Sequence, residues 1–260
     1  MKTQEELYND TPPSLKEKGI RPFLKSETNS FGRFCADLIF ENLLKQKFAA
    51  IRIKNLQNLQ KRDMSKPNII YAPHICWWDG ILAYFLNRKV FNFDAIGMME
   101  NLHSLPFLRK IGAFSVDKKS PKVILESLTF ASQSLNSPQK ALYIFPQGII
   151  RPQDHTPIKF SSGISYIAST LDGVNLIPLA IRYCFLRETS PEILVEVAEP
   201  MIFPKMQNRN ETTRQLQRYF ADLIENQRLE VANGKLQDYI PIWQKRDNLF
   251  RQIEKRIKPK

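Results

Sequence analysis

His74 and Asp79 are the residues of this chain whose types and spacing most directly suggest chemistry. The apolar segment 68–72 breaks at Pro73, and a second apolar pattern begins at Ile81. This pattern predicts a buried strand, a turn and a helix, so both residues lie where a strand passes into a helix. An imidazole beside a carboxylate can act as a general base, because the carboxylate fixes the ring tautomer and leaves one nitrogen to accept a proton.

The same pair also has a purely structural interpretation. His74 can satisfy the polar groups of the turn, and Asp79 can cap the helix that follows. Cys76 lies between them and is a further candidate nucleophile. A short motif stays a hypothesis until its structural context agrees with it, so both interpretations remain open from the pair alone.

Length and composition limit the classes of protein to consider. A chain of 260 residues can build one large α/β domain or two small ones. The first twenty residues are polar and charged, so we expect no secretory signal, and no segment reaches the ~18 uncharged apolar residues of a spanning helix. Three widely separated cysteines predict free thiols in a reducing, cytoplasmic compartment. The three histidines form no zinc-ligand spacing, and no phosphate-binding glycine loop appears.

The net charge of +12 favours anionic partners: phospholipid surfaces, phosphorylated substrates or nucleic acid. Charge alone does not choose among these partners. Nucleic acid is the least favoured, because no nucleic-acid-binding motif is present and the basic residues are scattered along the chain.

Residues 1–60 are predicted to form an N-terminal arm and an amphipathic helix. The first 25 or so residues are rich in Lys, Glu and Pro, which is typical of a poorly ordered segment. Between 31 and 48, apolar residues recur at helical spacing: Phe31, Phe34, Cys35, Leu38, Ile39, Leu43 and Leu44. Such a helix either lies in a membrane interface or packs on the core.

Residues 61–260 are predicted to form one compact unit without a linker. Strands are expected at 68–72, 91–98, 112–117, 141–145, 175–183 and 193–197, and helices at 100–110, 121–135, 162–170 and around 216–224. This alternation predicts a single α/β domain with a mixed, mostly parallel sheet flanked by helices. The basic tail 245–260 is either a solvated helix end or a patch that attracts phosphate.

Four segments, in order, resemble the motifs of the glycerolipid acyltransferases of the lysophosphatidic acid (PlsC-like) type. His74 to Asp79, followed by Gly80, matches the HxxxxD motif. Segment 112–118 is similar to Gly-x-[IF]-x-[IV]-x-Arg, segment 145–151 to Phe-Pro-Glu-Gly-Thr-Arg, and segment 177–180 to Val-Pro-[IVL]-[AVI]. The resemblance covers roughly residues 65 to 200, and motifs that agree in order and context support one another.

This resemblance implies transfer of an acyl group from coenzyme A or acyl carrier protein to a lipid hydroxyl, with no metal or redox cofactor. His74 would be the general base and Asp79 its orienting acid, and no role falls to Cys76. The implied substrate-binding residues are Lys118, Gln147, Gly148 and Arg151, and backbone N–H groups near Gly148 are candidates for the oxyanion. Lys118 and Arg151 also have an ordinary interpretation as solvated surface charges.

Two departures from the family pattern concern the acceptor. Gln147 replaces the usual Glu, and Ile149 replaces the usual Thr. The acceptor is therefore either a lysophospholipid or a non-phosphate lipid alcohol, such as a glycolipid or a carotenoid glycoside. A non-enzymatic lipid-binding protein of the same fold is the other alternative. The expected partners are a thioester donor, a lipid acceptor and an anionic membrane surface that the protein binds peripherally; the sequence does not give the oligomeric state.

Four further residues are assigned by their context. Trp77 and Trp78 are expected to line an acyl or membrane-facing surface, with one of the two in the core. His103 is expected to be structural, and His155 to be a loop residue.

Overall fold

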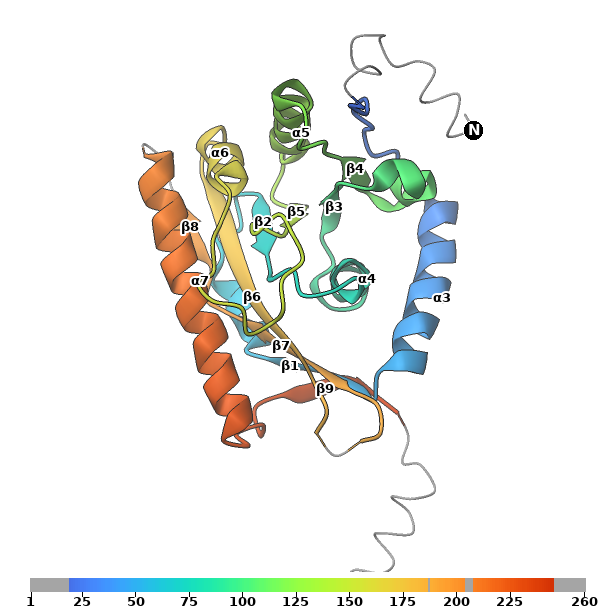
Figure 1. The fold of residues 1–260 in the computed structure, drawn as a ribbon, viewed down its shortest axis with the longest axis vertical. Coiled ribbons are helices and arrows are strands. Elements are labelled where there is room, and N and C mark those ends of the chain that lie inside the picture. Colours follow the sequence, from blue (N-terminus) through green and yellow to red (C-terminus); the bar gives the residue numbers. More distant parts are fainter. Residues whose placement is uncertain (1–18, 187, 204–207, 246–260) are drawn as a thin grey trace, which may run out of the picture.

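A computed structural model describes residues 19–186, 188–203 and 208–245 of the chain. Its centre is a nine-stranded sheet with the order β4-β3-β5-β2-β6-β7-β1-β9, in which β8 pairs with β6 (Figure 1). The strands are β1 (Ala50–Lys54), β2 (Asn68–Tyr71), β3 (Asp94–Met99), β4 (Ala113–Ser115), β5 (Lys140–Ile144), β6 (Val174–Cys184), β7 (Glu192–Val197), β8 (Met201–Phe203) and β9 (Ile240–Gln244).

Helices cover both faces of this sheet. The α-helices are α3 (Ser30–Lys47), α4 (Trp78–Leu86), α5 (Pro121–Ser134), α6 (Gly163–Ser169) and α7 (Arg209–Ala232). Short helical turns are η1 (Leu56–Lys61), η2 (Asn87–Phe91), η3 (Leu102–Ser104) and η4 (Pro106–Ile111). In Figure 1, α3 and α7 lie on opposite sides of the molecule, with α4 between α3 and the sheet.

The long strand β6 joins two parts of the sheet. Its residues 175–178 pair in parallel with β2, and its residues 179–184 pair antiparallel with β7. The pairs β2·β5, β3·β5, β3·β4 and β1·β7 are also parallel, while β1·β9 and β6·β8 are antiparallel. The predicted single α/β domain with a mixed, mostly parallel sheet is confirmed.

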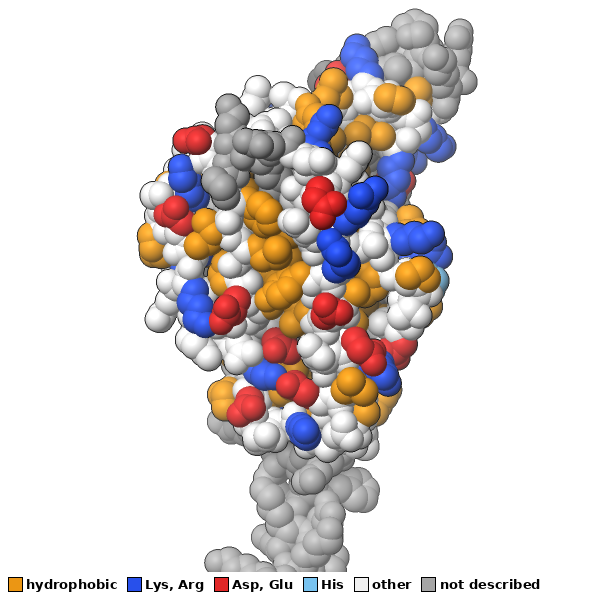
Figure 2. All heavy atoms as spheres, turned by 90° about the vertical axis from the view of Figure 1, so that its left-hand side faces the viewer, with side chains coloured by type: hydrophobic (Ala, Val, Ile, Leu, Met, Phe, Trp, Pro, Cys, Tyr) orange, Lys and Arg blue, Asp and Glu red, His pale blue; other side chains and the backbone are white. Residues whose placement is uncertain are grey.

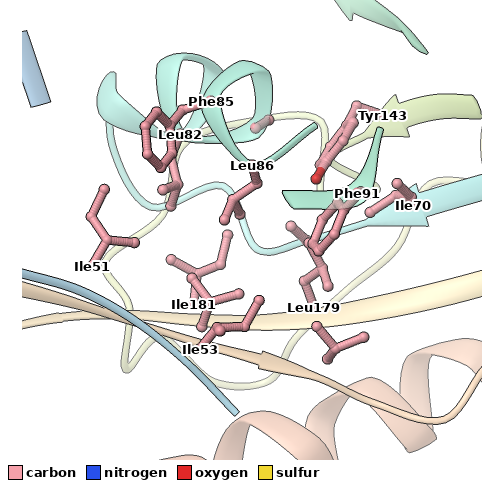
Figure 3. Close-up of a cluster of buried hydrophobic side chains, with 14 of the residues drawn as sticks. Ile51, Ile53, Ile70, Leu82, Phe85, Leu86, Phe91, Tyr143, Leu179 and Ile181 are labelled. Atoms are coloured by element: carbon pink, nitrogen blue, oxygen red, sulfur yellow. The ribbon is translucent and has the colours of Figure 1, made fainter. Parts of the chain in front are cut away.

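Alternating side chains place a separate hydrophobic core on each face of the sheet. On one face, α4 packs over apolar residues of β1, β6 and β7, among them Ile53, Ile181 and Leu179 (Figure 3). On the other face, α5, α6 and the first half of α7 pack over β2, β5 and the start of β6. The outer surface on the α7 side mixes basic and acidic side chains around a central apolar strip, so the positive charge forms no single patch there (Figure 2).

The local signals of the sequence explain most of these elements. Ser120 accepts a hydrogen bond from Val123 N–H and Pro121 occupies the first turn, so α5 begins where the sequence predicts. The expected strand at 91–98 begins later, at Asp94, because Asn92 adopts a left-handed conformation that ends η2. The expected helix at 100–110 is instead two short turns, η3 and η4, with Pro106 starting the second.

Three strands have no counterpart in the sequence prediction: β1, β8 and β9. They have three to five residues each. Strand β1 lies within the segment 1–60 that was assigned to an arm and a helix, so the sheet extends into that segment.

The expected disordered arm is wrong at its end, where residues 20–24 pack against β4. Leu24 accepts a hydrogen bond from Ser115 N–H and donates its own N–H to the Ser115 hydroxyl (2.8 and 2.7 Å). Burial of Ile20 and Leu24 holds this segment in place. The rest of the arm (residues 1–18) and the basic tail beyond residue 245 lie outside the described residues.

Helix α3 shows the expected periodicity but an unexpected orientation. Phe31, Phe34, Leu38 and Ile39 are 52–77% exposed, whereas Leu44 is fully buried. Polar residues face the protein instead: Arg33 pairs with Asp94, Asp37 with Arg88 and Glu41 with Lys89, at 2.8–2.9 Å. The apolar face of this helix therefore points mainly away from the core.

Candidate active site

The turn after β2 holds His74 by its backbone. The His74 N–H donates to Gln147 Oε1 and the His74 carbonyl accepts from Arg151 N–H, both at 2.8 Å. The imidazole also stacks on the ring of Phe145, with centroids 4.6 Å apart and an interplanar angle of 15°. Because β2 and β5 are parallel neighbours, the segment that follows β5 lies directly beside His74.

Asp79 lies in the first turn of α4 and is fully buried. Its Oδ2 accepts from His74 Nδ1 at 2.9 Å, from Ile75 N–H at 2.6 Å and from Cys76 N–H at 2.9 Å. Its Oδ1 accepts from the Tyr183 hydroxyl at 2.8 Å. A negative charge at a helix N-terminus is favourable, and these donors compensate its removal from water.

This geometry defines which nitrogen of His74 is available for chemistry. An ionised carboxylate only accepts hydrogen bonds, so Nδ1 carries the proton that faces Asp79 and Nε2 carries the lone pair. The His74 side chain is 25% exposed, whereas that of Asp79 is 0% exposed. The imidazole is therefore accessible from solvent, whereas the carboxylate is not.

Cys76 is in contact with the same carboxylate, with its Sγ 3.8 Å from Asp79 Oδ1. Burial and the Asp79 charge raise the pKa of the Cys76 thiol. The thiolate is the nucleophilic form of cysteine, so this environment disfavours a nucleophilic role for Cys76.

The two tryptophans beside the dyad differ in their surroundings. Trp78 packs edge-on against Phe48, with ring centroids 5.3 Å apart, and joins the core under α4. Trp77 is 61% exposed at the start of α4. One of the two therefore belongs to the core, and the other is free to contact a substrate or a surface.

The cations expected to bind the acceptor are brought to one side of the dyad. Lys118 Nζ donates to Glu100 Oε2 at 2.6 Å and to the carbonyl of Gly148. Gly148 adopts a φ of 70°, which favours glycine, and its N–H donates to the Phe145 carbonyl at 2.9 Å. The amides of Gly148 and Arg151 are therefore engaged within the protein, which removes both from the candidates for an oxyanion site.

Arg151 is linked to the dyad through its backbone, and its side chain is exposed. Gln147, expected to contact the substrate, places its amide oxygen on His74 N–H. Ile149 and Ile150 are 44% and 54% exposed between these residues. The segment beside the dyad thus combines one exposed guanidinium, one paired ammonium and two exposed apolar side chains.

The other two histidines lie apart from this arrangement. His103 is buried, its Nε2 donates to the Pro22 carbonyl at 2.8 Å, and burial lowers its pKa. His155 is exposed on the loop between β5 and α6. Both positions agree with their expected roles. Within the described ranges, no group of three or more His, Cys, Asp and Glu residues could hold a metal ion.

Sequence reasoning missed Tyr183 and Glu100. Tyr183 is 104 positions from Asp79, and no local pattern signals that its hydroxyl reaches the dyad. Glu100 directly follows β3, and Lys118 lies in the loop that follows β4. The opposite charges of these two residues, at the ends of neighbouring strands, could have predicted their contact.

Comparisons with known proteins identify the family of this chain and a structure with a similar fold. A family model described as Acyltransferase matches residues 50–182, which include His74, Asp79, Lys118 and Arg151. The crystal structure of the 1-acyl-sn-glycerophosphate (LPA) acyltransferase PlsC from Thermotoga maritima is similar in fold, with a TM-score of 0.52 and 12% sequence identity. The match covers 84% of this chain and 83% of that one. No curated protein matches the sequence.

Proposed function

The chain belongs to the acyltransferase family, and on that premise we propose that it transfers a fatty acyl group from a thioester to a lipid hydroxyl. The donor in this proposal is acyl-coenzyme A or acyl carrier protein, and His74 is the general base. The observation that carries the proposal is the His74–Asp79 contact of 2.9 Å, with Asp79 buried and His74 partly exposed.

The residues account for each proton in this reaction. The acceptor oxygen attacks the thioester carbonyl carbon while its proton passes to His74 Nε2, a step typically worth about 10²–10⁴ in rate. The intermediate then expels the thiolate with the electron pair of the carbon–sulfur bond, and the imidazolium returns the proton to sulfur. Asp79 stabilises the imidazolium throughout. The nucleophile belongs to the substrate, so no covalent enzyme intermediate is expected.

The experiment is a transfer assay with the purified chain, labelled acyl-coenzyme A or acyl carrier protein, and a panel of lysophospholipids. We expect His74→Ala to abolish transfer and His155→Ala, the exposed loop control, to leave it unchanged. Transfer by His74→Ala at the wild-type rate would refute the proposed base. Liposome binding without thioester consumption on any acceptor would favour the non-enzymatic lipid-binding alternative.

A non-phosphate lipid alcohol is the second candidate acceptor, supported by a specific observation. Lys118 is paired with Glu100, Gln147 is uncharged, and Ile149 and Ile150 are exposed beside the dyad. A carboxylate near the acceptor disfavours a phosphate, and an uncharged headgroup avoids that repulsion. The assay therefore compares lysophosphatidic acid with uncharged lysolipids. If phosphate is the natural ligand, Glu100→Gln should improve the KM for lysophosphatidic acid; if it is not, only the uncharged acceptor should react.

We also propose that the chain binds an anionic membrane surface peripherally through α3. The support is the exposed set Phe31, Phe34, Leu38 and Ile39 on a helix with Lys45 and Lys47 in its last turn. No helix among the described residues is long and apolar enough to cross a membrane.

Vesicle sedimentation tests this surface. Phe34→Ser together with Leu38→Ser should weaken binding to anionic vesicles, whereas Leu229→Ser on α7, across the molecule from α3, should not (Figure 1). Equal binding by all three proteins would contradict the assignment to α3.

A further inference from the structure

Tyr183 lies one residue before the end of β6, and its side chain is on the face of the sheet that α4 covers. Its hydroxyl reaches Asp79 Oδ1 at 2.8 Å. The phenol ring packs near Phe48, with centroids 5.7 Å apart, so the ring is held by the core and the hydroxyl alone enters the polar turn. Burial and the Asp79 charge raise the pKa of Tyr183 well above its ordinary value, so the hydroxyl stays a donor.

The two oxygens of Asp79 depend on very different donors. Oδ2 receives two backbone N–H groups in addition to His74, and these stay in place whatever the side chains are. Oδ1 receives the Tyr183 hydroxyl, and the other donor near it among the described residues is the Cys76 thiol at 3.8 Å, a weak one. Loss of the Tyr183 hydroxyl would leave a fully buried carboxylate oxygen almost without a partner.

Tyr183 also touches the acceptor side of the site. Its backbone N–H donates to Gln153 Oε1 at 3.1 Å, and Gln153 lies two residues after Arg151. Its neighbour Arg182, on the opposite face of the strand, pairs with Asp154 at 2.7 Å. The end of β6 therefore contacts the dyad through the Tyr183 hydroxyl, and it contacts the loop after Arg151 through two hydrogen bonds, one from the Tyr183 backbone N–H and one from the Arg182 side chain.

We propose that Tyr183 is a positioning residue for the catalytic dyad, which fixes the rotation of the Asp79 carboxylate so that Oδ2 stays aligned with His74 Nδ1. This inference rests on the proposed acyl transfer for its kinetic readout. Tyr183 does not itself reach the substrate. Its role is to keep the acceptor geometry of Asp79 during the step in which His74 becomes charged.

The test variant is Tyr183→Phe, which removes only the hydroxyl. We expect kcat to fall about tenfold with KM for donor and acceptor within twofold, because a transition-state interaction is weakened and no substrate contact is lost. Tyr143→Phe is the matched control. It removes a buried hydroxyl that has no hydrogen-bond partner among the residues the structure describes, and it lies in the same core as Leu86, Phe91 and Ile70 (Figure 3). The control should change kcat by less than about twofold.

A second measurement separates positioning from general packing. In an Asp79→Asn background, Tyr183→Phe should change the residual kcat by less than about twofold, because the two residues act as one unit. A purely structural role predicts the same tenfold loss in both backgrounds. Wild-type kcat in Tyr183→Phe, or equal losses in both backgrounds, would overturn the proposal.

The proposal can also be judged without activity. The proton between His74 Nδ1 and Asp79 should give a low-field NMR resonance that is missing in His74→Ala. We expect Tyr183→Phe to shift or broaden this resonance and Tyr143→Phe to leave it unchanged. If the wild type transfers no acyl group, the proposed function fails, and this resonance still decides the role of Tyr183: an unchanged resonance in Tyr183→Phe would refute it.

Discussion

Two buried carboxylates, Asp79 and Glu196, are each in contact with a tyrosine hydroxyl and lie on opposite faces of the sheet, but their surroundings differ. Asp79 has donors at 2.6–2.9 Å and one neighbour, His74, that is 25% exposed. Glu196 has longer contacts: Lys54 at 3.4 Å, Asn55 at 3.1 Å and Tyr239 at 3.5 Å. The two carboxylates therefore differ in the length of their contacts and in the exposure of their partners, and the proposed role of Asp79 rests on this difference.

The surroundings of the two groups explain this difference. Asp79 is at a helix N-terminus, where two backbone N–H groups, His74 and Tyr183 donate to its carboxylate and no Lys or Arg is needed as a partner. Glu196 faces α7, where burial and the nearby Glu230 raise its pKa while Lys54 opposes the shift. Lys54 is only 13% exposed and also pairs with Glu230 at 2.6 Å, so this cluster closes on itself and joins α7 to β1. We interpret it as a structural contact.

Asp79→Asn should have the largest effect of the variants that test this contrast. The neutral Asn amide lacks the negative charge that stabilises the imidazolium, and its NH2 group cannot accept a hydrogen bond. We therefore expect kcat to fall about 10²–10⁴-fold. Steady-state transfer assays measure this, with Glu196→Gln as the matched carboxylate control at less than about twofold. A comparable loss of kcat in both variants would erase the distinction between the clusters.

Lys54→Met should break the second cluster without harming the first. It leaves Glu196 and Glu230 close together and without their cation, so we expect the free energy of unfolding to fall by about 2 kcal/mol. Denaturant unfolding gives the value, and kcat of the folded protein should be unchanged. Lys61→Met, which removes the exposed partner of Glu199, should cost less than about 0.5 kcal/mol. If both variants lose a similar free energy of unfolding, the buried cluster of Lys54, Glu196 and Glu230 stabilises the protein no more than an exposed ion pair does.

Gln147→Leu should weaken the dyad from the backbone side. His74 N–H loses its acceptor, and we expect kcat to fall about tenfold. Gln147→Glu keeps an oxygen at that position, so it should retain most of the rate and separate the backbone contact from the effect of charge on acceptor choice. A rate in Gln147→Leu equal to the wild type would mean that Arg151 N–H and the Phe145 stack suffice to hold His74.

Glu196→Gln should have the smallest effect, and its sign depends on pH. The folded state raises the pKa of Glu196, so the charged carboxyl costs stability once the pH is above that pKa. The variant should therefore be more stable than the wild type near pH 7, by about 1 kcal/mol or less. The difference should vanish as the pH falls below about 4, where Glu196 is protonated in both states. Thermal melts across this range are the measurement, and a less stable variant at pH 7 would reverse our interpretation.

The sequence predicts the features that depend on near neighbours along the chain. His74 and Asp79 are five residues apart, and a strand, a proline and a helical pattern are enough to place them together. The start of α5 is likewise encoded by Ser120 and Pro121.

Local sequence patterns do not predict contacts between distant residues or the direction in which a helix faces. The contact of Gln147 with His74 spans 73 positions, and Tyr183 is still further from Asp79, so both require the register of the sheet. The spacing of α3 predicts a helix with an apolar side. It cannot say that Arg33, Asp37 and Glu41 would find partners on the protein and turn that apolar side outward.

The alternation of β6 has a consequence for how mutations in this strand would be tolerated. Arg182 contacts the Asp154 loop on one face, and Tyr183 contacts Asp79 on the other. A saturation-mutagenesis screen can score cellular abundance and acyl transfer separately. In such a screen, substitutions at these two adjacent positions should change the two scores in different ways. Substitutions at 182 should lower both scores together, while Tyr183→Phe should lower transfer and leave abundance intact.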